Sequence, residues 1–118
     1  MKKVLYVDCC IRGEESRTKK IADAFFANLS DQYEVQHLDL KNENLKPLVN
    51  DFFDEREKLI AEHNLTHPRF RYAHELADVD MVVIAAPFYD LSFPSLLKIY
   101  IENCTVDGIT FASTSTGL

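Results

Sequence analysis

The sequence lacks an excess of basic residues. It contains 13 lysines and arginines against 19 aspartates and glutamates, for a formal net charge of −6. Nucleic acids and anionic membrane surfaces are bound by basic protein faces, so this balance argues against both as partners. Two classes of partner are therefore set aside before any motif is considered.

Long apolar runs are also missing. The longest, at residues 81–87, has the length of a buried strand, whereas a helix that spans a bilayer needs about 20 apolar residues. The start of the chain leads directly into a strand pattern and shows neither the apolar core nor the cleavage site of a signal peptide. The three cysteines are an odd set without CxxC spacing, which is a poor disulfide framework. Together these features predict a cytoplasmic protein without a membrane segment.

Repeats, low-complexity tracts and the nucleotide-binding motifs GxGxxG and GxxxxGK[ST] are absent as well. What is present is an alternation of short β-rich runs and helical periodicities. Hydrophobic residues make up 47% of the 118 residues, which is enough for one packed domain spanning residues 1–118. The order strand, helix, strand, helix, helix, strand, helix predicts an α/β fold with a parallel sheet and helices on both faces.

The individual elements are expected at definite places. Strands are predicted at residues 4–7, 33–40 and 82–86, with a candidate fourth strand at 109–113. One helix is predicted from its N-cap Ser16 to about residue 31, a second begins at a cap of Asn50 or Asp51, and two more cover about 70–77 and 94–104. The helical residues expected to face the core are Ile21, Ala22, Phe25, Phe26 and Leu29 in the first helix, and Leu96, Leu97, Tyr100 and Ile101 in the last.

Topology selects two loops as candidates for chemistry. In an open parallel sheet, ligands bind beyond the carboxyl ends of the strands. The first such loop, at residues 8–16, leads into a helix N-terminus, where free amides, the helix dipole, Ser16, Thr18 and Arg17 suit a phosphate. The alternative is that Ser16 only caps the helix and Arg17 is solvated.

The second loop covers residues 87–92 and follows the clearest strand. Phe88 and Tyr89 stand where the buried strand reaches solvent, and aromatic side chains there suit a flat ring system. The alternative is that both aromatic rings pack beneath the neighbouring helix. The local pattern leaves these two interpretations open.

The two loops, in this order and spacing, resemble those of the flavodoxin-like FMN-dependent NAD(P)H oxidoreductases, which include NADH-azoreductases and NAD(P)H:quinone reductases. The resemblance is carried by residues 3–7 leading to 16–18, by 82–89, and by the continuations 94–102 and 108–111. It implies a flavodoxin-like three-layer α/β/α fold whose short parallel sheet has the strand order 2-1-3. It also implies FMN as cofactor, NAD(P)H as co-substrate, hydride transfer to a quinone, azo dye or similar small acceptor, and a homodimer. No catalytic acid or base is expected, because the flavin carries the chemistry.

The resemblance assigns roles to matched positions. It implies that the FMN phosphate and ribityl chain are held by Cys10, Ser16, Arg17 and Thr18. It implies that the flavin ring is bound by Pro87, Phe88, Tyr89, Asp90 and Leu91.

Three departures from the family pattern stand out. Cys9 and Cys10 replace residues that are often serines, and Asp90 replaces a common asparagine. The chain ends at Leu118, before a glycine-rich loop that the family places over the flavin. We therefore expect an incomplete version of the family domain.

Three functions remain open. The first is the FMN-dependent oxidoreductase, and the second is a truncated, catalytically silent member that dimerises through the edge strand at 82–86. The third is a binding module for another anionic ligand at Ser16. A redox pair at Cys9 and Cys10 is a weaker candidate. A metal site at His63 and His67 is weaker still, because Asn64 and Pro68 interrupt the helix and no third ligand is evident, so no metal is expected.

Overall fold

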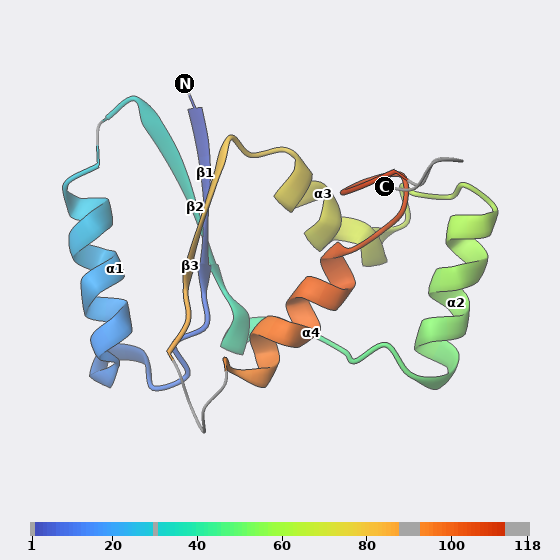
Figure 1. Ribbon diagram of the computed structural model, residues 1–118, viewed down its shortest axis with the longest axis horizontal. Coiled ribbons are helices and arrows are strands. Elements are labelled where there is room, and N and C mark those ends of the chain that lie inside the picture. Colours follow the sequence, from blue (N-terminus) through green and yellow to red (C-terminus); the bar gives the residue numbers. More distant parts are fainter. Residues whose placement is uncertain (1, 30, 88–92, 113–118) are drawn as a thin grey trace. The chain divides into compact units, whose positions relative to one another are not determined.

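The computed structural model describes residues 2–29, 31–87 and 93–112, which contain three strands and four α-helices (Figure 1). Short 3₁₀ turns at Gly13–Glu15, Leu40–Asn42 and Pro68–Phe70 complete the regular structure. None of the helices in these residues has the length and apolarity needed to cross a bilayer. The main elements are β1 (Lys2–Asp8), α1 (Arg17–Ala27), β2 (Tyr33–Asp39), α2 (Asn50–Ala61), α3 (Arg71–Ala77), β3 (Met81–Ala85) and α4 (Ser95–Cys104).

The chain divides into two compact units. Unit 1 comprises Met1–Asn44 and Val79–Lys98, and unit 2 comprises Leu45–Asp78 and Ile99–Leu118. Unit 1 contains the three strands and α1, whereas unit 2 contains α2, α3 and the second part of α4. The expectation of a single domain over residues 1–118 stays a prediction.

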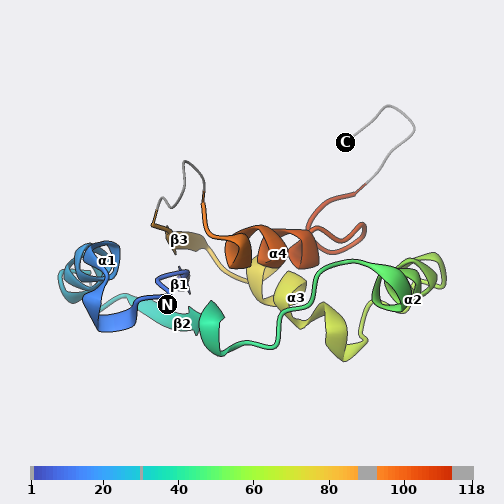
Figure 2. The ribbon, with the colours of Figure 1, turned by 90° about the horizontal axis from the view of Figure 1, so that it is seen from below.

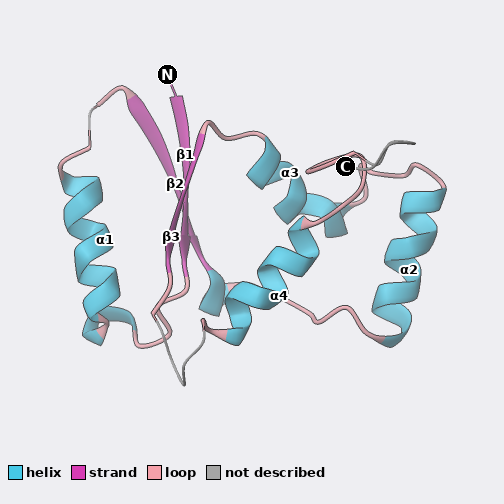
Figure 3. Cartoon of the chain, in the orientation of Figure 1, coloured by secondary structure: helices cyan, strands magenta, loops and turns pink. Residues whose placement is uncertain are grey.

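The three strands, which are magenta in Figure 3, form a parallel sheet in the order β2-β1-β3, as predicted. The central strand β1 is apolar without alternation, and its last five residues are buried, as is typical of a strand covered on both faces. The register places Tyr6 beside His37, and it places Asp8 beside Asp39 on one side and Ala85 on the other. Side chains that share one face of the sheet at the ends of the strands are thereby brought together.

Helix α1 covers one face of this sheet, as Figure 2 shows when viewed from below. Ser16 is its N-cap, as predicted, and the Ser16 hydroxyl oxygen accepts a hydrogen bond from the Lys19 amide at 3.2 Å. The prediction was wrong for Ile21 and Phe25, which are 73% and 47% exposed. They lie four residues apart on α1, on a stripe of the helix next to the stripe that packs against the sheet. The packed cluster consists of Tyr6, Cys10, Ala22 and Ala85, with Phe26 against it.

Unit 2 has an apolar cluster of its own, formed by side chains from α2, α3 and the segment after α4. Two of its helices begin or face differently from expectation. Asn50 does not cap α2 with its side chain but lies at φ +53°, and Val49 precedes it as the cap residue. Ile101 of α4 is 50% exposed, although Leu97 and Tyr100 are buried as expected. The buried members of the cluster are Leu59, Phe70, Ala73 and Val106.

The candidate fourth strand is not formed over residues 109–112, and residue 113 lies outside the described residues. The segment is instead a tight turn, in which the Gly108 amide donates to the Phe111 carbonyl at 2.8 Å. The Thr110 hydroxyl donates to the Cys104 carbonyl at 2.6 Å and accepts from the Val106 amide at 3.1 Å. These bonds fold the segment back onto the end of α4, so its β-forming side chains do not extend the sheet.

Candidate functional site

The two loops selected by topology begin next to each other in unit 1. The Cys9 amide donates to the Ala85 carbonyl at 2.9 Å, and the Cys10 thiol lies 3.7 Å from the same oxygen. The chain beyond β1 and the chain beyond β3 therefore leave the same edge of the sheet. Pro87 is buried at the start of the second loop. The predicted ring-binding residues Phe88, Tyr89, Asp90 and Leu91 lie outside the described residues.

The first loop winds through a 3₁₀ turn into the N-terminus of α1. Gly13 adopts φ +60° in this loop, a left-handed conformation that favours glycine. The buried Ser16 oxygen is committed to the Lys19 amide, which supports the capping interpretation of Ser16. A helix leaves its first amides without intrahelical acceptors, and the described residues offer none to the amides of Arg17 and Thr18. These two amides and the positive end of the helix dipole suit an anion.

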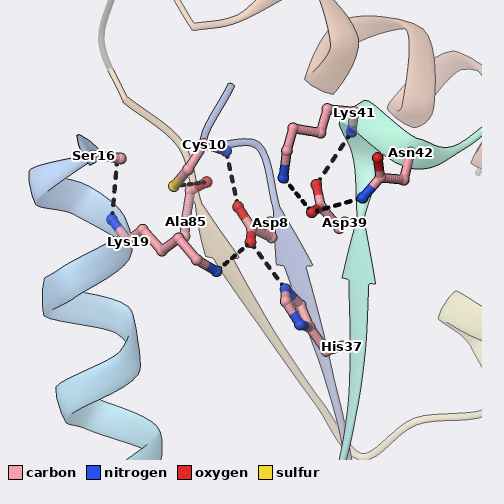
Figure 4. Close-up of polar contacts among 9 residues, drawn as sticks. All are labelled: Asp8, Cys10, Ser16, Lys19, His37, Asp39, Lys41, Asn42 and Ala85. Carbon is pink, nitrogen blue, oxygen red and sulfur yellow. Dashed lines mark hydrogen bonds and ion pairs between the residues drawn. The ribbon is translucent and has the colours of Figure 1, made fainter. Parts of the chain in front are cut away.

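A buried carboxylate lies at the base of this loop (Figure 4). Asp8, the last residue of β1, is fully buried, and its Oδ1 accepts the Cys10 amide at 2.9 Å. Its Oδ2 lies 2.9 Å from the Lys19 ammonium and 2.9 Å from His37 Nε2. One carboxylate thus joins the loop, α1 and β2. We call Asp8, Lys19 and His37 the Asp8 cluster.

Electrostatics keep Asp8 ionised. Burial acts to raise the pKa of its carboxyl group, but hydrogen bonds from Lys19, from the Cys10 amide and from His37 outweigh burial and lower the pKa to about 2. The bond to Asp8 raises the pKa of Lys19 to about 12, against the effect of its own burial. Because the carboxylate carries no proton, His37 must donate from Nε2, which assigns the position of its ring proton.

The Asp8 cluster determines which charges are available to a ligand. Lys19 is mostly buried and held by Asp8, so its charge is already compensated. Arg17, the first residue of α1, is exposed and bears a charge that Asp8 does not compensate. The site can therefore bind an anion through two amides and a guanidinium. The amide and carbonyl of Cys10 are already bonded to Asp8 and Gly13, and its thiol is buried.

The alternative sites receive no support from the described residues. Burial raises the pKa of the Cys9 thiol to about 12 and also raises the pKa of Cys10, so neither is a thiolate near neutral pH. His63 lies just past α2 at φ +58°, and His67 caps the next turn by accepting the Arg69 amide. No group of three metal-ligating side chains occurs in residues 2–29, 31–87 and 93–112.

Sequence reasoning missed the Asp8 cluster. Asp8 was interpreted as the start of a polar loop, although it immediately follows an unbroken apolar strand and continues it. His37 lies on the same face of β2 as Val35, and only the register of β1 with β2 shows that it reaches Asp8. A charged residue at the last position of a buried strand was the available signal.

Comparisons with known proteins agree with this architecture. A family model described as having a flavodoxin-like fold matches residues 2–118. An FMN-dependent NADH:quinone oxidoreductase of Clostridium perfringens is 40% identical over 99% of this chain, and one from Clostridium acetobutylicum is 39% identical over the same share. The crystal structure of an azoreductase from Bacillus anthracis has a TM-score of 0.85, with 27% identity over 99% of this chain. The chain spans 61%, 60% and 62% of the lengths of these three proteins.

Proposed function

Because the chain belongs to this flavodoxin-like family, we propose that it binds FMN and works in an FMN-dependent NAD(P)H oxidoreductase that reduces quinones or azo compounds. The observation that carries the proposal is the N-terminus of α1, where the Arg17 and Thr18 amides have no acceptor among the described residues. This N-terminus lies at the edge of the sheet where the two loops begin. The names of the similar proteins, FMN-dependent NADH:quinone oxidoreductase and azoreductase, support the choice of ligand and reaction.

The residues present fit the phosphate end of FMN. Arg17 and Thr18 would donate their amides to the phosphate, and the Arg17 guanidinium would add its charge. Ser16 would fix the helix start, and Cys10, whose amide is bonded to Asp8, would contribute by shaping the loop. Pro87, Phe88, Tyr89, Asp90 and Leu91 are proposed to hold the flavin ring, as the family resemblance implies.

Bound FMN would supply the redox chemistry, by taking a hydride from NAD(P)H and passing it to the acceptor. The chain would position both reactants and exclude water from them. Reduction of a quinone then consumes the two electrons and one proton of that hydride, and a second proton comes from solvent. We assign no acid or base among the described residues to this transfer.

The first test is a titration of FMN into the 118-residue protein, followed by flavin fluorescence. We expect saturable, stoichiometric binding, and then NADH oxidation that depends on a quinone. Arg17→Met should weaken FMN binding about tenfold through loss of one charged contact to phosphate. The matched control is Arg71→Met, which removes the same charge from unit 2 and should leave the affinity unchanged.

A folded protein that takes up no FMN would contradict the proposal. It would favour the second candidate, a catalytically silent member of the family. FMN binding without NADH-dependent quinone reduction would favour a flavin-binding role without catalysis by the 118 residues alone.

We also propose a homodimer, formed through the open edge of the sheet. In the described residues β3 pairs only with β1, and Val82 and Ile84 on β3 are exposed. Light scattering after size exclusion should give twice the chain mass, and Ile84→Lys should shift the protein toward monomer. A monomer at all concentrations would contradict this.

The three cysteines are free thiols, which fits a cytoplasmic location that cell fractionation can check.

A further inference from the structure

The proposed phosphate site does not use Asp8, the most deeply buried charge among the described residues. Asp8 has no exposed surface, and its contacts with the Cys10 amide, Lys19 and His37 are each 2.9 Å long. A buried carboxylate is costly unless it is fully paired and hydrogen-bonded, so its presence here calls for a role. Its location, at the end of β1 and directly before the loop, indicates which part of the molecule depends on it.

The first contact of Asp8, with the loop, is a hydrogen bond from a backbone amide. Asp8 Oδ1 accepts the Cys10 amide, and Cys10 in turn accepts the Gly13 amide with its carbonyl at 2.9 Å. The Gly13 carbonyl then accepts the Ser16 amide, also at 2.9 Å. This chain of bonds leads from the buried carboxylate to the N-cap of α1. The direction of the first free amides of α1 therefore depends on how Asp8 holds Cys10.

The second contact balances charge. The Lys19 ammonium lies on Asp8 Oδ2 and is only 13% exposed, so it compensates the carboxylate from within the first turn of α1. Without it, a buried negative charge would face any anion at the helix N-terminus, and repulsion would weaken binding. Lys20, the next residue, is exposed, and the contacts of the Asp8 cluster do not include it.

We propose that Asp8 is the positioning residue of the phosphate loop, which it shapes through the Cys10 amide, and that Lys19 is its compensating charge. The proposal rests on the proposed function, since the ligand it names is the phosphate of FMN. It goes beyond that function because it assigns the shape of the anion site to a buried residue, Asp8, that does not touch the ligand.

The experiment compares the affinities of FMN and riboflavin, which differ only in the phosphate. Asp8→Ala removes the acceptor for Cys10, whereas Asp8→Asn keeps an oxygen that can accept that amide and removes the charge. Lys19→Met leaves the carboxylate uncompensated. Lys20→Met is the matched control, because it removes the same charge one residue further along and touches neither Asp8 nor Cys10.

Asp8→Ala should lower the affinity for FMN about tenfold while changing that for riboflavin little, as expected for one lost hydrogen bond to a charged group. Asp8→Asn should retain the preference for FMN. Lys19→Met should lower the preference about tenfold, and Lys20→Met should leave it within about twofold. A purely structural role would reduce thermal stability and leave the ratio of the two affinities unchanged.

Two results would overturn the proposal. One is a folded Asp8→Ala protein with the wild-type ratio of FMN to riboflavin affinity, and the other is an equal effect of Lys19→Met and Lys20→Met. If Asp8→Ala does not fold, the lysine pair still decides, because both variants keep Asp8.

Failure of the proposed function is recognised separately, as binding of neither flavin by the wild-type protein. In that case amide hydrogen exchange decides without a ligand. Faster exchange of the Cys10, Gly13 and Ser16 amides in Asp8→Ala than in the wild type and Asp8→Asn supports the positioning role. Unchanged exchange in folded Asp8→Ala overturns it.

Discussion

The two units bury polar groups in different ways. Unit 1 buries an ionised carboxylate, Asp8, and satisfies it with donors from a loop, a helix and a strand. Unit 2 instead buries donors, an amide and a guanidinium that also lies 3.5 Å from Glu55, and directs them to main-chain carbonyls. Asn103 donates to the Lys46 carbonyl at 3.0 Å, and Arg69 donates to the Phe52 carbonyl at 2.6 Å. Hydrogen bonds to main-chain carbonyls fix the path of the backbone. A buried carboxylate also responds to pH and to nearby ligands. Chemistry is therefore expected in unit 1 and scaffolding in unit 2.

The largest expected effect tests the apolar side of this comparison. Phe70 is almost fully buried in the unit 2 cluster, so Phe70→Ala should lower the free energy of unfolding by about 3–5 kcal/mol. Phe53 belongs to the same unit but is 40% exposed, and Phe53→Ala should cost much less. Urea denaturation followed by circular dichroism measures both. Equal losses would show that the unit 2 cluster is not the apolar core of that unit.

The next effect concerns acid and belongs to unit 1. Asp8 has a pKa of about 2 in the folded protein against an ordinary 3.8, so its pairing stabilises the fold above about pH 4. The contribution, about 2 kcal/mol, should disappear as the pH falls from about 4 to about 2. Measured as the free energy of unfolding against pH, this fall should be smaller in Asp8→Asn, and Phe70→Ala should leave its slope unchanged. An identical pH dependence with and without Asp8 would show that the buried carboxylate does not set unit 1 apart from unit 2.

A smaller effect compares one glycine from each unit. Gly13 lies at φ +60° in open space, so Gly13→Ala should cost about 1 kcal/mol from backbone strain alone. Gly108 lies at φ +94°, and a Cβ there would be 2.8 Å from Leu65 Cδ1. Gly108→Ala should therefore cost more, about 2 kcal/mol, since Leu65 must also move. Thermal unfolding of the two variants checks the order, and a greater loss for Gly13→Ala would reverse it.

The smallest effect is a gain within unit 2. His63 follows α2 at φ +58°, and the Asn64 amide donates to the Leu59 carbonyl across it at 2.8 Å. This is a helix C-terminus that favours glycine, so His63→Gly should raise the free energy of unfolding by about 0.5–1 kcal/mol. Glu62→Gly, at an ordinary φ of −84°, should give no gain. A gain from Glu62→Gly but none from His63→Gly would show that the backbone strain does not lie at His63.

The sequence predicted the sheet better than the site. β1 and β3 are apolar without alternation, which identifies parallel strands, and Ser16 identifies the start of α1. The expectation of a buried strand was wrong for one face of β3, where Val82 and Ile84 are exposed because no further described strand pairs with β3. The Asp8 cluster depends on the register between β1 and β2 and on the direction of one lysine side chain, which no local pattern encodes. Local propensity also failed at residues 109–112, where the hydrogen bonds of Thr110 outweigh the β preference of its neighbours.

The ring stack of Tyr6 has a practical consequence. The Tyr6 ring stacks on Phe26 and on His37, each with centroids 4.5 Å apart, and its hydroxyl is buried among the described residues without a hydrogen-bond partner. The chain contains no tryptophan, so its near-ultraviolet dichroism and intrinsic emission come from tyrosine and phenylalanine. Tyr6 stacks on a member of the Asp8 cluster, so the part of this signal that is lost in Tyr6→Phe reports on order in unit 1 without a label.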